Sequence, residues 1–290
     1  MATINRPVMR YHGGKFRLAP WIIQFFPPHR VYVEPYGGAA SVLMRKDPAY
    51  ADVYNDLDHE VVNVFRVLRD REMAADLERQ VRLTPWSRHE FDLAMEEASD
   101  DPIESARRTI YRAFAGFGTT SRRAGATGFR ARPYRTRNTG VRDWLTYPDA
   151  IASFVERMIT VTIEERQALE VIGMYDSDDT LFYCDPPYPR DTRSSIRCDY
   201  DLQRAYRHEM TDDDHRDLAR ALNQVQGMAI ISSYPSALYD ELYADWTRVS
   251  TDTLSDGARP RTECLWISPA ALSRRMPLFE DMDCPEPVDF

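Results

Sequence analysis

The chain has 290 residues, of which 43% are hydrophobic and 29% charged, and its formal net charge is −9. The length suits one large or two smaller domains, and the composition excludes a fibrous or wholly disordered chain. No apolar run reaches the roughly 18 residues that a membrane-spanning helix needs, and no apolar signal segment opens the chain. We therefore expect a cytoplasmic protein without a membrane partner.

Cysteine and histidine give no sign of a metal centre or a disulfide framework. The four cysteines, Cys184, Cys198, Cys264 and Cys284, form no Cys-x-x-Cys pair, and the six histidines are scattered along the chain. We expect free thiols in a reducing compartment and no bound metal.

The charge is unevenly distributed. Residues 107–142 contain ten arginines and no acidic residue, so the rest of the chain is strongly acidic. Arginines interleaved with aromatic side chains are typical of surfaces that bind phosphates and unstacked bases. The alternative is an arginine-rich loop without a partner. The arginines expected to contact a nucleic acid are Arg122, Arg123, Arg130, Arg132, Arg135 and Arg137.

The first part of the chain predicts alternating short helices and strands. We expect a helix over 21–26, a strand over 31–34, a helix over 39–45 and a strand over 51–54. Apolar residues then recur at helical spacing from Asp58 onward. Two more helices are expected over 86–117, interrupted before Pro102, and residues 116–148 predict an irregular lobe.

The second part returns to alternation. Apolar and β-branched residues over 155–163 precede a strand over 181–184, and Thr211 with Asp214 predicts a capping box that opens a helix. A strand over 228–232, a helix over 237–243 and strands over 246–249 and 263–267 follow, and the acidic tail 276–290 is expected to be disordered. The alternation predicts an α/β fold with a doubly wound, mostly parallel sheet.

The sharpest motif is Asp185-Pro186-Pro187-Tyr188, directly after an apolar strand. The two prolines end the sheet ladder and stiffen the turn, which places a carboxylate, two carbonyls and an aromatic ring where parallel sheets bind ligands. This set suits a flat ring that carries an amine, because Tyr188 can stack on the ring while Asp185 and a carbonyl accept from the amine. The alternative is an ordinary turn at the end of a strand.

Three further turns carry candidate binding residues. Glu34 precedes Tyr36 and a glycine pair after the first strand, and glycines let backbone approach a ligand closely. Asp56 ends the second strand, where an acid can accept from ribose hydroxyls, although Asp56 or Asp58 can equally cap the next helix. Lys15 stands on a glycine-rich turn near the N-terminus and suits a carboxylate or phosphate.

Taken in order, these motifs resemble the Dam-type (D12 class) DNA adenine methyltransferases, which include phage members. The matching pieces are YHGGK at 11–15, VEPYGGAAS at 33–41, YND at 54–56, FYCDPPY at 182–188, ISSYPS at 231–236 and TECLWIS at 262–268. The resemblance implies a Rossmann-like methyltransferase domain formed by residues 1–80 and 151–275. It also implies an inserted target-recognition lobe over 81–150 in the family's alpha arrangement.

The resemblance also implies S-adenosyl-L-methionine as methyl donor and double-stranded DNA as partner, in a bacterial or phage-infected cell. The residues implied at the cofactor are Tyr11, Lys15, Glu34, Tyr36, Gly37, Gly38, Asp56 and Asp185. Those implied at the flipped adenine are Asp185, Pro186 and Tyr188. The turn reads Gly-Gly-Ala-Ala where Gly-x-Gly is commoner, and such a turn is expected to loosen cofactor binding.

Two alternatives remain open at this point. The methyl acceptor can be the cytosine 4-amino group or RNA, although an Asp before the prolines favours adenine. The chain can also be a DNA-binding protein that kept the fold without catalysis, against which the intact Lys15, Asp56, Asp185 and Tyr188 argue. The recognition sequence, oligomeric state and any restriction partner are not encoded in these motifs.

Overall fold

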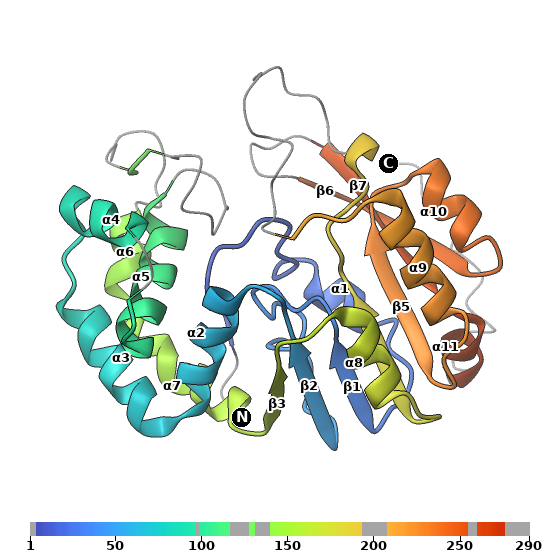
Figure 1. Cartoon of the computed structure of the whole chain (residues 1–290), viewed down its shortest axis with the longest axis horizontal. Coiled ribbons are helices and arrows are strands. Elements are labelled where there is room, and N and C mark those ends of the chain that lie inside the picture. The colour runs from blue at the N-terminus through green and yellow to red at the C-terminus, as the bar shows by residue number, and fades with distance from the viewer. Residues whose placement is uncertain are drawn as a thin grey trace, which may run out of the picture.

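The computed structural model describes residues 4–96, 99–116, 128–130, 140–192, 208–254 and 260–275. Its centre is a seven-stranded sheet with helices on both faces and a group of helices beyond its β3 edge (Figure 1). The strands are β1 (Val31–Glu34), β2 (Ala51–Asn55), β3 (Val161–Glu164), β4 (Thr180–Cys184), β5 (Met228–Ser233), β6 (Thr247–Leu254) and β7 (Pro260–Ile267).

Helix α1 precedes β1, and the other described helices lie between later strands or after β7. They are α1 (Ala19–Ile23), α2 (His59–Arg69), α3 (Arg71–Leu83), α4 (Arg88–Met95), α5 (Pro102–Ala115), α6 (Gly140–Leu145), α7 (Pro148–Met158), α8 (Ala168–Tyr175), α9 (Asp212–Leu222), α10 (Ala237–Leu242) and α11 (Pro269–Arg274), with a short 3₁₀ turn, η1 (Arg190–Thr192). In the part of the chain that the structure describes, no helix combines the length and apolarity needed to cross a membrane.

The strand order β3-β2-β1-β4-β5-β7-β6 confirms the predicted doubly wound sheet and is consistent with a Rossmann-like methyltransferase fold. Strand β1 pairs in parallel with β2 on one side and with β4 on the other. The chain therefore reverses its direction of winding at β1, and ligands bind at such a point, beyond the carboxyl ends of the strands. Strand β7 pairs antiparallel with both β5 and β6.

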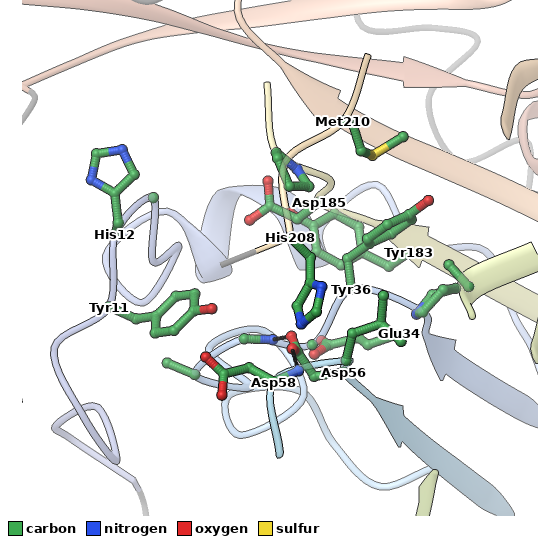
Figure 2. Close-up of a pocket in the computed structure, with 18 of the residues that line it drawn as sticks. Tyr11, His12, Glu34, Tyr36, Asp56, Asp58, Tyr183, Asp185, His208 and Met210 are labelled. Atoms are coloured by element: carbon green, nitrogen blue, oxygen red, sulfur yellow. Dashed lines mark hydrogen bonds between the residues drawn. The ribbon is translucent and has the colours of Figure 1, made fainter. Parts of the chain in front are cut away.

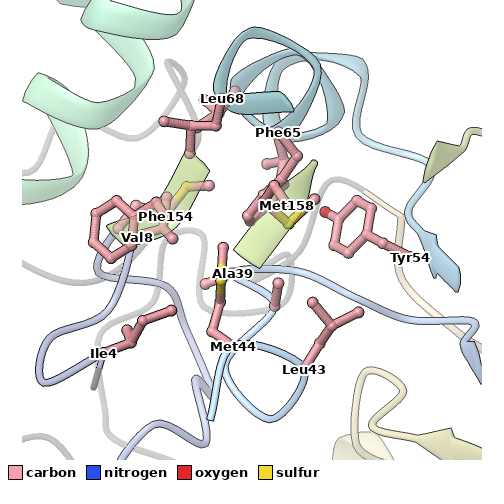
Figure 3. Close-up of a cluster of buried hydrophobic side chains, with 14 of the residues drawn as sticks. Ile4, Val8, Ala39, Leu43, Met44, Tyr54, Phe65, Leu68, Phe154 and Met158 are labelled. Carbon is pink, nitrogen blue, oxygen red and sulfur yellow. The ribbon is translucent and has the colours of Figure 1, made fainter. Parts of the chain in front are cut away.

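Both faces of the sheet are buried, and neighbouring strand residues face opposite cores. Tyr32 and Tyr54 belong to one apolar cluster, whereas Val33 and Val53 belong to the other. The first cluster also contains residues of the N-terminal segment, α2 and α7, which Figure 3 shows converging around Phe65 and Met158. Burial on both faces explains why these strands read as continuous apolar runs.

Several predicted elements differ from those observed. The helix expected over 39–45 is a series of turns, because Gly38 and Ala40 adopt positive φ angles of 48° and 52° that a right-handed helix does not accommodate. Helix α6 lies inside the segment predicted to be irregular, and α8 and α11 were not expected. The predicted capping box at Thr211 and Asp214 is confirmed at the start of α9.

Helices α4, α5 and α6 lie within residues 81–150 and pack on α2, α3 and each other. Their apolar side chains share one buried cluster with the sheet. The domain boundaries predicted from the sequence remain a prediction, and so does a separate recognition lobe. The tail 276–290, expected to be disordered, lies outside the described residues.

The basic segment is partly neutralised by acids that lie outside it. Arg107 binds Glu90 and Glu104 at 2.9 and 2.6 Å, and Arg108 binds Glu104 at 2.7 Å. Arg112, on the same helix, binds Glu60 of α2 at 2.6 Å in the core. Arg107 and Arg112 join α5 to α4 and α2, whereas Arg108 pairs within α5. The predicted positive surface therefore cannot be read from the arginine count alone.

The buried ion pair between Arg112 and Glu60 is expected to be essential for stability. Arg112→Ala leaves the Glu60 carboxylate buried without this cation, and we expect the free energy of unfolding to fall by about 3–5 kcal/mol. Urea unfolding followed by circular dichroism measures the change. The exposed pair of Arg216 and Glu241 provides a control, since Arg216→Ala should shift stability by no more than about 0.5 kcal/mol. Equal effects of the two variants would contradict the prediction.

Candidate functional site

A cavity of about 350 Å³ opens at the carboxyl ends of β1, β2 and β4. Every residue predicted from the sequence at the cofactor lines it: Tyr11, Lys15, Glu34, Tyr36, Gly37, Gly38, Asp56 and Asp185. Figure 2 shows Asp185 across the cavity from Asp56 and Asp58, with Tyr11 on a third side. The turn after β4 and the turn after β1 therefore meet in one site, as the motifs predicted.

Asp185 is held by contacts from two other segments. Its Oδ1 atom accepts from the Ser232 hydroxyl at 2.7 Å and lies 2.9 Å from the Lys15 ammonium. Lys15 also donates to the carbonyl of Gly13 at 2.7 Å, and its side chain is only 4% exposed. Lys15, which was expected near the carboxylate of a cofactor, thus pairs with Asp185, which was expected at the target base.

Tyr188 and Pro186 are buried beside the cavity, and neither belongs to its lining. The Tyr188 hydroxyl donates to Glu263 Oε2 at 2.8 Å. The Lys15 ammonium lies 4.7 Å from the centre of the Tyr188 ring, and the ring of Tyr234 meets it edge-on at 4.8 Å. Asp185 is thus the one predicted base-contacting residue that lines this cavity.

Glu34 is a carboxyl group in an apolar setting, only 3% exposed. Burial raises its pKa to about 8, although hydrogen bonds from the Tyr32 hydroxyl and the Leu43 amide act in the opposite direction. Burial disfavours the charged form of a carboxyl group. Glu34 is therefore mainly protonated near pH 7 and is ready to ionise when a cation arrives.

The glycine pair is explained by close contacts and backbone conformation. A side-chain carbon on Gly37 would lie 2.2 Å from the ring of Tyr54, and one on Gly38 would lie 2.9 Å from the ring of Tyr11. Gly38 also has φ of +48°, which favours glycine. The turn therefore packs between the rings of Tyr54 and Tyr11, and both glycines border the cavity.

Asp58, not Asp56, caps helix α2, because its side chain accepts from the amide of Glu60. Asp56 is half-buried and accepts from the amides of Gly38 and Asp58, both at 2.8 Å. Burial raises its pKa to about 6. Asp56 therefore does not cap α2, and its role at a ribose remains a prediction.

One further wall of the cavity was not predicted from the sequence. It is formed by the segment before and at the start of α9, with His208 and Met210 labelled in Figure 2. The residues of this wall are His208, Glu209, Met210, Asp214 and Asp217. The motifs ISSYPS and TECLWIS also contain the residues that touch Asp185 and Tyr188, but neither pattern alone indicates such contacts.

Five of the six arginines predicted at a nucleic acid lie outside the described residues: Arg122, Arg123, Arg132, Arg135 and Arg137. The sixth, Arg130, donates from Nε to the carbonyl of Gly116 at 2.6 Å. Within the described ranges, no three His, Cys, Asp or Glu side chains gather in a way that suits a metal ion.

Comparison with known proteins agrees with this geometry. A family model described as D12 class N6 adenine-specific DNA methyltransferase matches residues 11–255, and so covers the motifs that line the cavity. A search of curated proteins found no match. The chain belongs to the D12 class N6 adenine-specific DNA methyltransferases.

Proposed function

We propose that the chain transfers a methyl group from S-adenosyl-L-methionine to the 6-amino group of an adenine flipped out of double-stranded DNA. One observation carries this proposal: the Asp185 corner and the Glu34–Gly38 turn border the same cavity. Family membership supports the class of reaction. The roles of individual residues are proposals that rest on the contacts described above.

The cavity fits the proposed donor by its volume and its chemistry. Its acids include Glu34 and Asp56, which lie with the close backbone of Gly37 and Gly38. A protonated acid near pH 7 can ionise to pair with the ammonium of the methionine part, and Asp56 can accept from ribose hydroxyls. When bound, the sulfonium supplies an electrophilic methyl group, so these residues need only bind and orient it.

Asp185 is proposed to bind the target amine. An amine conjugated to a purine is a weak nucleophile, and an acceptor on its hydrogens returns electron density to nitrogen. The contacts from Ser232 and Lys15 fix the carboxyl group before a base arrives. A fixed acceptor requires no reorganisation during the reaction, which is how preorganised polar groups lower barriers.

A base within a duplex cannot reach this site, so the proposal requires base flipping at a cost of about a few kcal/mol. The arginines of residues 122–137 are proposed to bind phosphates, together with Arg259 and Arg261. Binding should therefore weaken as salt concentration rises.

The proposed role of Asp185 at the target amine can be tested by removing its carboxyl group. Asp185→Ala should lower methyl transfer by about 10²–10³-fold or more, because the amine loses its acceptor, while circular dichroism stays unchanged. Incorporation of labelled methyl groups into DNA measures the rate. Asp179→Ala removes an exposed carboxyl group that pairs with Arg274 and serves as the control. Wild-type turnover in Asp185→Ala would refute the assignment.

The second prediction concerns Glu34. Its pKa of about 8 should fall on pairing with the cofactor's ammonium, so binding at pH 7 should release close to one proton. Calorimetry in two buffers with different ionisation enthalpies measures this release. Glu34→Gln should bind more weakly and release almost none. A wild-type binding enthalpy that is the same in both buffers would contradict the assignment.

The acceptor base is tested separately. Long-read methylation mapping of DNA from cells that express the protein should show N6-methyladenine in one sequence context. Methylated cytosine, or methylation of RNA alone, would support the rival substrates instead. Cells that express the Asp185→Ala variant should show no such marks.

A further inference from the structure

The buried contact between Tyr188 and Glu263 has no role in the reaction as proposed so far. Glu263 lies on β7, between Thr262 and Cys264. Because β7 runs antiparallel to β5, with Cys264 opposite Ser233 at the end of β5, Glu263 reaches just beyond the edge where the parallel strands end. An antiparallel strand thereby presents one of its early residues to the functional edge of the sheet.

Glu263 is surrounded by groups of the site. Its Oε2 accepts from the Tyr188 hydroxyl at 2.8 Å, and both side chains are buried, each 6% exposed. Burial raises the pKa of Glu263, Lys15 opposes this effect, and Asp185 adds to it. A buried carboxyl group is costly unless it is hydrogen-bonded, and Glu263 accepts its hydrogen bond from the tyrosine of the Asp-Pro-Pro-Tyr motif.

Two further contacts act on the ring of Tyr188. The ring meets Tyr234 edge-on at 4.8 Å and has the Lys15 ammonium 4.7 Å from its centre. These contacts act on the ring itself, and the hydrogen bond to Glu263 adds a contact at its far end. A hydrogen bond at the hydroxyl fixes the position of the ring's far end. Together with the edge-on contact of Tyr234, it holds the ring in the plane that a stacking partner must share.

We propose that Glu263 is a positioning residue for the target base: it holds the Tyr188 ring, through the phenol hydroxyl, in the plane on which the flipped adenine stacks. This inference rests on the proposed function, because it presumes that Tyr188 contacts the base. Glu263 itself touches neither the base nor the cofactor.

The experiment compares four variants with the wild-type protein. Glu263→Leu removes the acceptor, Glu263→Gln keeps an oxygen that can accept, Tyr188→Phe keeps the ring without its hydroxyl, and a double variant combines Glu263→Leu with Tyr188→Phe. The readouts are fluorescence of a duplex with 2-aminopurine at the target position, KM for DNA, kcat, and cofactor affinity by calorimetry.

We expect Glu263→Leu to weaken base engagement about tenfold or more, as loss of a buried hydrogen bond implies. The effect should appear in the fluorescence signal and in KM for DNA, whereas cofactor affinity stays within about twofold of wild type. Glu263→Gln should restore most of the signal. The double variant should be no worse than Tyr188→Phe, because both lack the same contact.

Three outcomes would overturn the inference. They are an unchanged fluorescence signal in Glu263→Leu, additive losses in the double variant, and a loss of cofactor affinity equal to the loss of base engagement, which would indicate a structural role. Failure of the proposed function looks different. In that case the wild-type protein itself gives no fluorescence increase and no adenine methylation.

Discussion

The parallel pairing of β1 with both β2 and β4 is the constraint on which the site depends. These three strands end at one edge of the sheet, so the residues that follow them meet, although they are up to about 150 residues apart in sequence. Glu34, Asp56 and Asp185 follow or end different strands and line one cavity. A change in the order of the strands would separate these acids without altering any motif.

The electrostatics of the site follow from its burial. Three acidic groups at this edge, Glu34, Asp56 and Glu263, have raised pKa values because burial penalises their charge. Lys15 brings a positive charge among them and binds Asp185. The site therefore combines acids whose pKa values are raised by burial with a fixed ion pair, a combination typical of functional clefts.

The contacts of Lys15 and Glu263 divide the site into two connected parts. On the cavity side, acids face the space proposed for the cofactor. On the other side, Tyr188 is enclosed by Lys15, Tyr234 and Glu263. Lys15 contacts both parts, so a change in its position would alter its contacts with Asp185 and with the ring of Tyr188. The turn after β4 is thus supported by three other segments.

The sequence by itself determined the local features: the apolar runs of β1, β4 and β5, the capping box at Thr211, and the turn residues after each strand. These depend on neighbours in the chain, and periodicity and turn chemistry record them. The sequence did not determine that turns replace a helix over 38–45, that Arg112 forms an ion pair with Glu60, or that Glu263 accepts a hydrogen bond from Tyr188. Those features depend on partners from distant segments, and only the tertiary structure, through strand order and burial, decided which residues meet.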